Sequence, residues 1–276
     1  MTELATIRAI YRYPVKGLSA QGMPIAALAA GETLAGDRRY AIENGPSGFD
    51  PAAPAYLPKQ RFLMLMKNER LARLDTSFED ASRTLSIREN GHEAVRGDLG
   101  TAHGRAAIEA FFAAFCSDEL RGPPKILGAR GHSFSDVARK VVSIINLASV
   151  AKIAEFVGGG RGRGRPVDPL RFRGNLYVEG WPPFAELDLV GREIALGSAR
   201  GRIVKRIVRC AATNVEPTTG IRDLDIPKSL MQTLGHSDCG IYAEVTAGGA
   251  VAPGDAVGLS APASSSAQDA ASAAGG

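Results

Sequence analysis

The chain has 276 residues, 45% hydrophobic and 22% charged, a composition that excludes wholesale disorder and allows one large or two modest domains. Its 33 Lys and Arg against 29 Asp and Glu leave a net charge of only +4, too small to indicate nucleic acid or an anionic membrane as the main partner. The cysteines Cys116, Cys210 and Cys239 are too few for a disulfide framework or a four-cysteine iron–sulfur or zinc site.

Neither a secretory signal nor a membrane span is expected from the sequence. The first eight residues include an acidic residue and no apolar run. The longest candidate for a span, residues 141–157, is interrupted by Asn146, Lys152 and Glu155. We therefore expect a cytoplasmic protein of a reducing compartment, with three free thiols and no membrane partner.

The first part of the chain predicts short strands and one helix. Residues 7–13 alternate apolar and polar side chains and end at Pro14, which is typical of a half-buried strand. Four apolar side chains in residues 105–116 recur at i, i+3, i+4 and i+7 and predict a helix that packs on a core. Glu89-Asn90-Gly91 predicts a hairpin turn. Further strands are predicted at residues 39–42, 62–67 and 84–88.

The second part is richer in strands. A break at residues 122–124, Gly-Pro-Pro, separates two predicted domains, residues 1–120 and 121–259. Residues 141–145 predict a strand, and Asn146 is the expected N-cap of the helix that follows. Other short strands are predicted at residues 175–178, 193–196, 203–209, 240–245 and 256–259. So many strands with one or two helices predict a barrel-like domain, and the Ala, Ser and Gly of residues 260–276 predict a disordered tail.

The positive charge of the second half is concentrated in two short segments. They contain ten of the 14 Lys and Arg after residue 150: Arg161, Arg163, Arg165, Arg171, Arg173, Arg200, Arg202, Lys205, Arg206 and Arg209. Guanidinium groups match phosphate geometry, so the clusters indicate an anion site. A solvated basic loop is the alternative for residues 161–165, and RNA binding is a more remote one because no aromatic residues interleave with the arginines.

Cys210 ends a predicted strand beside several of these cations. A thiol in such surroundings is expected to act as a thiolate, which is a suitable ligand for heavier transition metals. A buried structural cysteine is the alternative interpretation of this residue alone.

Residues 209–220, RCAATNVEPTTG, resemble the metal-binding cysteine motif of MOSC domains, the molybdenum cofactor sulfurase C-terminal family, which includes the mitochondrial amidoxime-reducing components and their bacterial relatives. Four more segments resemble motifs of this family in the same order along the chain. They are Tyr13-Pro14-Val15-Lys16-Gly17, Gly36-Asp37-Arg38-Arg39-Tyr40, Arg171-Phe172-Arg173-Gly174-Asn175 and Pro253-Gly254-Asp255-Ala256-Val257. The resemblance covers about residues 5–259.

The resemblance implies a β-rich α+β fold, with a small N-terminal β-barrel domain packed against a MOSC β-barrel domain that has a few helices. It also implies a molybdenum–molybdopterin cofactor between the two domains, with Cys210 as metal ligand and catalytic residue. By position, the cations that would pair with the phosphate and the polar pterin edge are Lys16, Arg38, Arg173 and Arg209. Asn175 and Thr213 would orient backbone and ligand groups.

The chain departs from the family pattern at several positions. Gly17 stands where relatives often have Ser, and Gly174 where they have Pro. Arg139 and Lys140 replace small hydroxyl residues before the central strand, and could reach the phosphate or reflect a displaced loop. Cys239 replaces an aromatic residue near the substrate opening. It could be a second reactive thiol or, as we favour, a packing residue.

The activity that the resemblance implies is the reduction of small N-hydroxylated substrates by oxygen-atom transfer at molybdenum. Because the chain lacks an iron–sulfur motif, the electrons would come from an external electron-transfer protein. The alternative is a non-catalytic carrier of molybdenum cofactor or sulfur. A more remote alternative is an anion- or RNA-binding barrel that uses residues 161–173.

Overall fold

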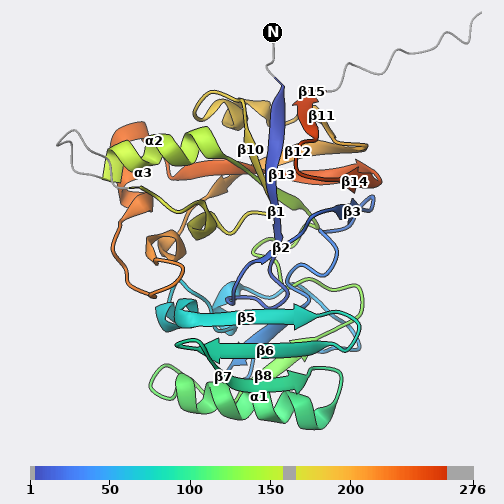
Figure 1. The fold of residues 1–276 in the computed structure, drawn as a ribbon, viewed down its shortest axis with the longest axis vertical. Coiled ribbons are helices and arrows are strands. Elements are labelled where there is room, and N and C mark those ends of the chain that lie inside the picture. Colours follow the sequence, from blue (N-terminus) through green and yellow to red (C-terminus); the bar gives the residue numbers. More distant parts are fainter. Residues whose placement is uncertain (1–3, 158–165, 260–276) are drawn as a thin grey trace, which may run out of the picture.

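A computed structural model describes residues 4–157 and 166–259. Figure 1 shows two parts stacked along the long axis, a barrel at one end and a smaller sheet with a helix at the other. Two predicted features, most of the loop at residues 158–166 and the tail at residues 260–276, fall outside the described residues. Within the described residues, no helix is long and apolar enough to cross a membrane.

Seven strands close a β-barrel. In order around it they are β1 (Ala5–Arg12), β10 (Leu176–Glu179), β9 (Val142–Asn146), β13 (Asp238–Ala247), β12 (Ala199–Val208), β11 (Glu193–Leu196) and β15 (Ala256–Leu259). The barrel closes because β1 pairs antiparallel with both β10 and β15. Its interior is filled by fully buried aliphatic side chains such as Ile7, Ile144 and Ile241. With the few helices described below, this confirms the predicted β-rich α+β fold.

The N-terminal strand β1 therefore belongs to the barrel together with strands from the end of the chain. The short strand β2 (Gln21–Gly22) follows β1 in the chain and pairs antiparallel with it, and β3 (Ala26–Leu28) pairs with β14 (Gly249–Val251). After β3 the chain leaves the barrel and builds the second part before it returns at β9.

The second part, here the N-terminal unit, contains a three-stranded meander of β5 (Leu74–Glu79), β6 (Thr84–Glu89) and β7 (His92–Asp98). A second pair is formed by β4 (Tyr40–Asn44) and β8 (Pro124–Gly128). The turn between β6 and β7 has positive φ at Asn90 (52°) and Gly91 (81°), which confirms the predicted hairpin.

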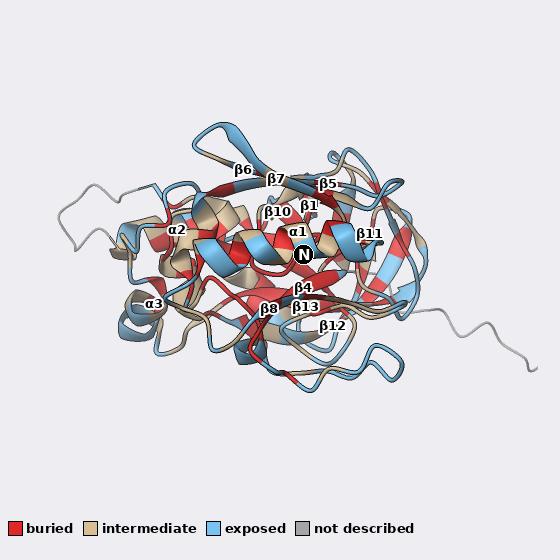
Figure 2. Ribbon diagram, turned by 90° about the horizontal axis from the view of Figure 1, so that it is seen from below, coloured by how far each residue is buried: buried red, intermediate tan, exposed pale blue. Residues whose placement is uncertain are grey.

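The predicted helix of the N-terminal unit is α1 (Ala102–Phe115), which begins at Thr101, whose Oγ1 accepts a hydrogen bond from Gly104 N at 3.0 Å. Ile108 and Phe112 are fully buried in the core of this unit. Figure 2 shows α1 lying across the end of the molecule with exposed residues on its outer side.

The strand predicted at residues 62–67 is wrong. Residues 59–61 form a 3-10 helix, η1 (Lys59–Arg61), Phe62 makes a single bridge with Glu43, and a turn follows in which Met64 N donates to Asn68 Oδ1 at 3.0 Å. Four consecutive side chains from Phe62 to Leu65 are buried. The apolar run thus reflects a segment covered on all sides, which composition alone does not distinguish from a strand.

Two helices lie together beside the barrel, α2 (Leu147–Val157) and α3 (Ile226–Leu234). The predicted cap of α2 is confirmed, since Asn146 Oδ1 accepts from Ala148 N at 3.1 Å. The sequence analysis missed α3, which ends at Gly235 with φ of 75°. Short 3-10 helices complete the fold: η2 (Glu69–Arg73), η3 (Pro169–Phe172), η4 (Ala185–Leu189) and η5 (Ala211–Asn214).

Candidate functional site

A polar cavity lies where the N-terminal unit meets the barrel part. It contains six of the residues that the sequence analysis selected, Lys16, Arg38, Arg173, Asn175, Cys210 and Thr213. They come from segments that are far apart in the chain, and the fold brings them to one place. The other charged and aromatic side chains that line the cavity are Asp37, Lys59, Asp136, Arg171, Phe172 and Tyr242.

Cys210 lies two residues after the end of β12, at the N-cap position of the short helix η5. Its side chain is partly exposed, whereas Cys116 and Cys239 are buried. The loop around it is held locally, because Thr213 donates from Oγ1 to the Cys210 carbonyl at 2.9 Å. Lys59 Nζ lies 3.4 Å from Cys210 Sγ and donates a hydrogen bond to the sulfur. The thiol therefore opens into the cavity beside an ammonium group.

Two lysines share one carboxylate on the cavity wall. Lys16 donates to Asp136, and also to the Phe134 carbonyl at 2.9 Å, while Lys59 Nζ lies 3.7 Å from Asp136 Oδ2. Burial raises the pKa of Asp136, but Lys16, Lys59 and Arg38 outweigh it and hold that pKa well below its usual range. Burial likewise lowers the pKa of Lys59, but Asp136 and Cys210 outweigh it, so the net shift is upward. Asp136 is therefore ionised beside the Lys59 ammonium, whereas burial lowers the pKa of Lys16.

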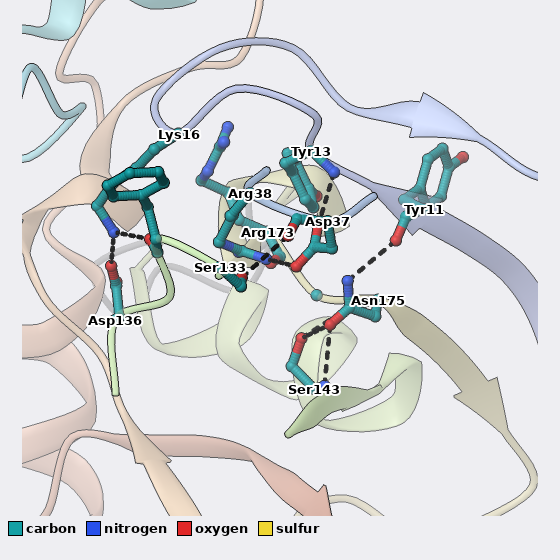
Figure 3. Close-up of polar contacts among 12 residues, drawn as sticks. Tyr11, Tyr13, Lys16, Asp37, Arg38, Ser133, Asp136, Ser143, Arg173 and Asn175 are labelled. Carbon is teal, nitrogen blue, oxygen red and sulfur yellow. Dashed lines mark hydrogen bonds and ion pairs between the residues drawn. The ribbon is translucent and has the colours of Figure 1, made fainter. Parts of the chain in front are cut away.

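Two guanidinium groups lie against the Tyr13 ring (Figure 3). Arg38 lies 5.0 Å and Arg173 lies 4.1 Å from the ring centroid. Arg38 pairs with Asp37, whose other oxygen accepts a hydrogen bond from the backbone N of Tyr13 at 2.8 Å. Burial lowers the pKa of Arg173, and its Nη2 has no hydrogen-bond partner within the described residues although it is buried.

The cavity carries more positive than negative charge. The positive charge of Arg171 is balanced by Asp223, which does not line the cavity; Arg171 Nη1 lies 2.8 Å from Asp223 Oδ1. Arg171 also donates to the Asn214 carbonyl at 3.1 Å. Asp37 and Asp136 offset two of the other four cations, which leaves a surplus of two positive charges. A buried guanidinium nitrogen without a partner is costly unless a ligand binds it, and a phosphate dianion matches both the charge and the donors. With the thiol of Cys210, this donor set fits a molybdenum–molybdopterin cofactor.

Asn175 supports the wall of the cavity through hydrogen bonds to the backbone (Figure 3). Its Oδ1 accepts from the Ser143 backbone N at 3.0 Å and from Ser143 Oγ at 2.8 Å, and its Nδ2 donates to the Tyr11 carbonyl at 3.2 Å. It therefore joins β9 to β1 at the point where both approach the cavity.

Arg209 was selected with the other cations, but it does not line the cavity. It is buried, donates to the carbonyls of Cys239 and Phe172, the latter at 2.9 Å, and lies 5.2 Å from the centroid of the Phe172 ring. Because β12 is irregular near its end, with register shifts against β13, Arg209 turns inward and holds the backbone of Phe172 and Cys239.

The departures from the family pattern have local explanations. Gly17 has φ of 87°, and a Cβ there would lie 3.1 Å from the Leu63 carbonyl oxygen, so a side chain would be strained. A Cβ at Gly174 would lie 2.3 Å from Ile145 Cγ1. At both positions, glycine thus fits a close contact that a larger residue would disturb.

Three other residues considered from the sequence lie away from the cavity lining. Arg139 pairs with Glu244 at 2.5 Å, and Lys140 pairs with Glu32 at 2.7 Å. Cys239 is fully buried in the core beneath α2 and α3, and burial raises the pKa of its thiol to about 12, which agrees with a packing residue.

The sequence analysis missed Lys59, Asp136 and Arg222. Arg222 joins the cysteine loop to the N-terminal unit: it donates to the Ala211 carbonyl at 2.9 Å, the Met66 carbonyl at 2.8 Å and the Glu69 carboxylate at 2.9 Å. Lys59 lies outside the motifs in a loop without periodicity, so no local signal indicates it. Arg222 follows the cysteine motif by two residues, which is the one signal that could have found it.

Comparisons with known proteins agree with this architecture. A family model for the MOSC N-terminal beta barrel domain matches residues 4–118, and one for the MOSC domain matches residues 128–258. A comparison with curated proteins found no match.

Among solved structures, the chain is similar to the YUAD protein from Bacillus subtilis, with 14% identity over 94% of this chain and 97% of that one and a TM-score of 0.43. It is also similar to YiiM from Geobacillus stearothermophilus and from Escherichia coli, with 21% and 20% identity, each over 44% of this chain and 54% of that one, and TM-scores of 0.33. On the two family models together, the chain belongs to the MOSC domain family, which is associated with molybdenum cofactor binding and whose members are often enzymes that depend on that cofactor.

Proposed function

We propose that the chain binds the molybdenum–molybdopterin cofactor and is an oxidoreductase that reduces small N-hydroxylated compounds by oxygen-atom transfer. One observation supports this most strongly: a cysteine thiol opens into a cavity in which cations outnumber carboxylates. In a family associated with this cofactor, the combination is what a phosphate-bearing ligand with a thiolate-bound metal requires.

The residues have distinct roles in this proposal. Cys210 would be the metal ligand, and Lys16, Arg38 and Arg173 would hold the phosphate and the polar pterin edge. Asn175 and Thr213 position the backbone around them through the hydrogen bonds described above. When bound, the cofactor supplies two-electron redox chemistry at the metal, while the protein supplies orientation and charge.

Polar groups at the cavity wall would orient an N–OH group. Burial raises the pKa of the Tyr242 hydroxyl, so this group stays protonated at neutral pH and can donate a hydrogen bond. The Lys59 ammonium lies next to Cys210 and offers further donors. The oxygen of an N–OH group has two lone pairs, so it can accept a hydrogen bond from Tyr242 and from Lys59.

The electrons would come from a separate electron-transfer protein. The chain has three cysteines, two of which are buried in the cores of different parts, so it cannot form a four-cysteine cluster. An exposed positive surface would favour an acidic donor protein. A carrier of cofactor or sulfur would need no such partner.

The experiment is metal analysis together with a turnover assay. Purified protein, reconstituted with cofactor, is expected to contain molybdenum and to reduce a simple amidoxime with an artificial electron donor. Cys210→Ser should lose both, whereas Cys239→Ala, which removes a thiol outside the cavity, should keep both. A wild-type chain with no more molybdenum than Cys210→Ser would overturn the proposal, and molybdenum without turnover would identify a carrier.

A further inference from the structure

The contact between Lys59 and Cys210 joins the two parts of the molecule at the sulfur itself. Lys59 Nζ lies 3.4 Å from Cys210 Sγ, across 151 positions of sequence. Lys59 begins η1 in the N-terminal unit, and Cys210 follows β12 of the barrel. The cysteine is thus supplied by one part of the fold and its hydrogen-bond donor by the other.

Neighbouring contacts hold Lys59 in this position. Its ammonium also lies 3.7 Å from Asp136, and its side chain is only 24% exposed. Its backbone is anchored by Phe62, which donates from N to the Lys59 carbonyl at 3.1 Å and packs edge-on against Phe134 with ring centroids 5.4 Å apart. A lysine confined by a carboxylate and a buried aromatic neighbour is not a freely solvated surface residue.

The other cavity lysine has a different environment. Lys16 donates to Asp136 and to the Phe134 carbonyl, and its ammonium makes no contact with sulfur among the described residues. Asp136 therefore lies between a lysine that faces the cavity wall and a lysine that faces the thiol. Of these two lysines, Lys59 is the one that contacts the Cys210 sulfur.

We infer that Lys59 is a positioning residue for Cys210: it donates a hydrogen bond to the sulfur and holds it toward the cavity. With metal bound, an N–H···S hydrogen bond withdraws electron density from the ligand, which raises the reduction potential of the metal. The consequence for the metal rests on the proposed function, but the effect on the thiol does not.

The first test uses the metal-free protein and compares wild type with Lys59→Met, Lys59→Arg and Lys67→Met. Lys67 is the matched control, since it is an exposed lysine in the same segment. The readout is the rate of alkylation by iodoacetamide at neutral pH. Cys116 and Cys239 do not compete, because both are fully buried and burial raises the pKa of each thiol to about 12. A Cys210→Ser sample provides the background rate.

Lys59→Met should slow alkylation by roughly threefold or more, because the sulfur loses its ammonium neighbour. Lys59→Arg should recover part of the rate, and Lys67→Met should react like wild type. A Lys59→Met protein that reacts as fast as wild type, with an unchanged melting temperature, would overturn the inference whether or not the chain binds molybdenum.

The second test measures the midpoint potential of bound molybdenum in reconstituted wild type, Lys59→Met and Lys59→Arg. Lys59→Met should shift it to lower values, with partial recovery in Lys59→Arg. An unchanged potential would refute the effect on the metal. If wild type takes up no molybdenum, the proposed function fails, and the alkylation rates still decide the role of Lys59.

Discussion

Arg38 and Arg173, which are 135 positions apart, are joined by a hydrogen bond from Arg38 Nη2 to the Arg173 carbonyl at 3.0 Å. Both residues have a left-handed backbone, with φ of 50° and 51°. This conformation costs a non-glycine residue roughly 1 kcal/mol and persists where surrounding contacts impose it, often at functional sites. Here it places two guanidinium groups against one tyrosine ring, and Arg38 is paired with the Asp37 carboxylate.

The first prediction concerns Arg173, whose guanidinium is buried and has an unpartnered Nη2. We expect inorganic phosphate to raise the melting temperature of the cofactor-free wild type, because an anion that binds only the folded state stabilises it. Arg173→Met should lose most of this increase. In the absence of phosphate it should be at least as stable as wild type, because a desolvated charge has been removed.

Arg171→Met is the control for that experiment. Arg171 is more buried than Arg173, with 5% of its surface exposed, and is paired with Asp223. Its removal breaks this buried ion pair and should destabilise the chain by about 3 kcal/mol in urea unfolding. Equal stability of the two variants would contradict the assignment of Arg173 as the cation without an acid.

A second prediction concerns Arg222, which ties the cysteine loop to the N-terminal unit. Arg222→Ala removes hydrogen bonds to the carbonyls of Ala211 and Met66 and to the Glu69 carboxylate. We expect a loss of about 2 kcal/mol in the free energy of unfolding and faster proteolysis of residues 211–222. Arg222→Lys should recover part of the stability through Glu69. Unchanged proteolysis in Arg222→Ala would show that the loop is held by other contacts.

The third prediction concerns Asn175, which we assign to the support of the wall rather than to ligand binding. Asn175→Ala leaves the buried backbone N of Ser143 without its side-chain acceptor and should cost about 2 kcal/mol. At a temperature where the variant is folded, phosphate should stabilise it by as much as wild type. Loss of the phosphate response with unchanged stability would instead make Asn175 a ligand residue.

The fourth prediction concerns pH and Asp136. Its pKa is lowered in the folded state, so its contribution to stability is complete above the unfolded pKa of about 3.9 and is lost as pH falls toward the lower folded value. Asp136→Asn should destabilise the protein at neutral pH, because Lys16 and Lys59 lose their shared partner. It should also reduce the fall in stability that wild type shows below about pH 4 in urea unfolding. Parallel pH profiles for the two proteins would contradict this role.

Parts of the fold followed directly from local sequence patterns. The repeat of apolar residues predicted the helix that is α1, Asn146 was identified as the cap of α2, and Asn90-Gly91 indicated the hairpin between β6 and β7. These features depend on backbone geometry and on burial within about ten residues, which the sequence displays directly. The strand predicted at residues 62–67 is wrong for the same reason, because side chains that are buried on all sides show no hydrophobic period along the sequence.

The residues of the candidate site that lie in sequence motifs could be predicted. Lys16, Arg38, Arg173, Asn175, Cys210 and Thr213 were selected by resemblance to the family, and the fold places all six at one cavity. The resemblance did not distinguish a cation that faces the cavity from one that faces the core. The inward turn of Arg209 depends on irregular pairing between β12 and β13, which a linear pattern does not show.

By itself, the sequence determined which residues supply this protein's chemistry: Cys210 in its motif, and Lys16, Arg38 and Arg173 in motifs that follow a fixed order along the chain. It also determined many of the helices and strands around them. Only the tertiary structure decided that β1 closes a barrel with strands from the other end of the chain, and that Lys59 reaches Cys210. The physical reason is that these contacts form between segments more than a hundred residues apart. Their geometry follows from how the two parts pack and not from any local preference of the chain.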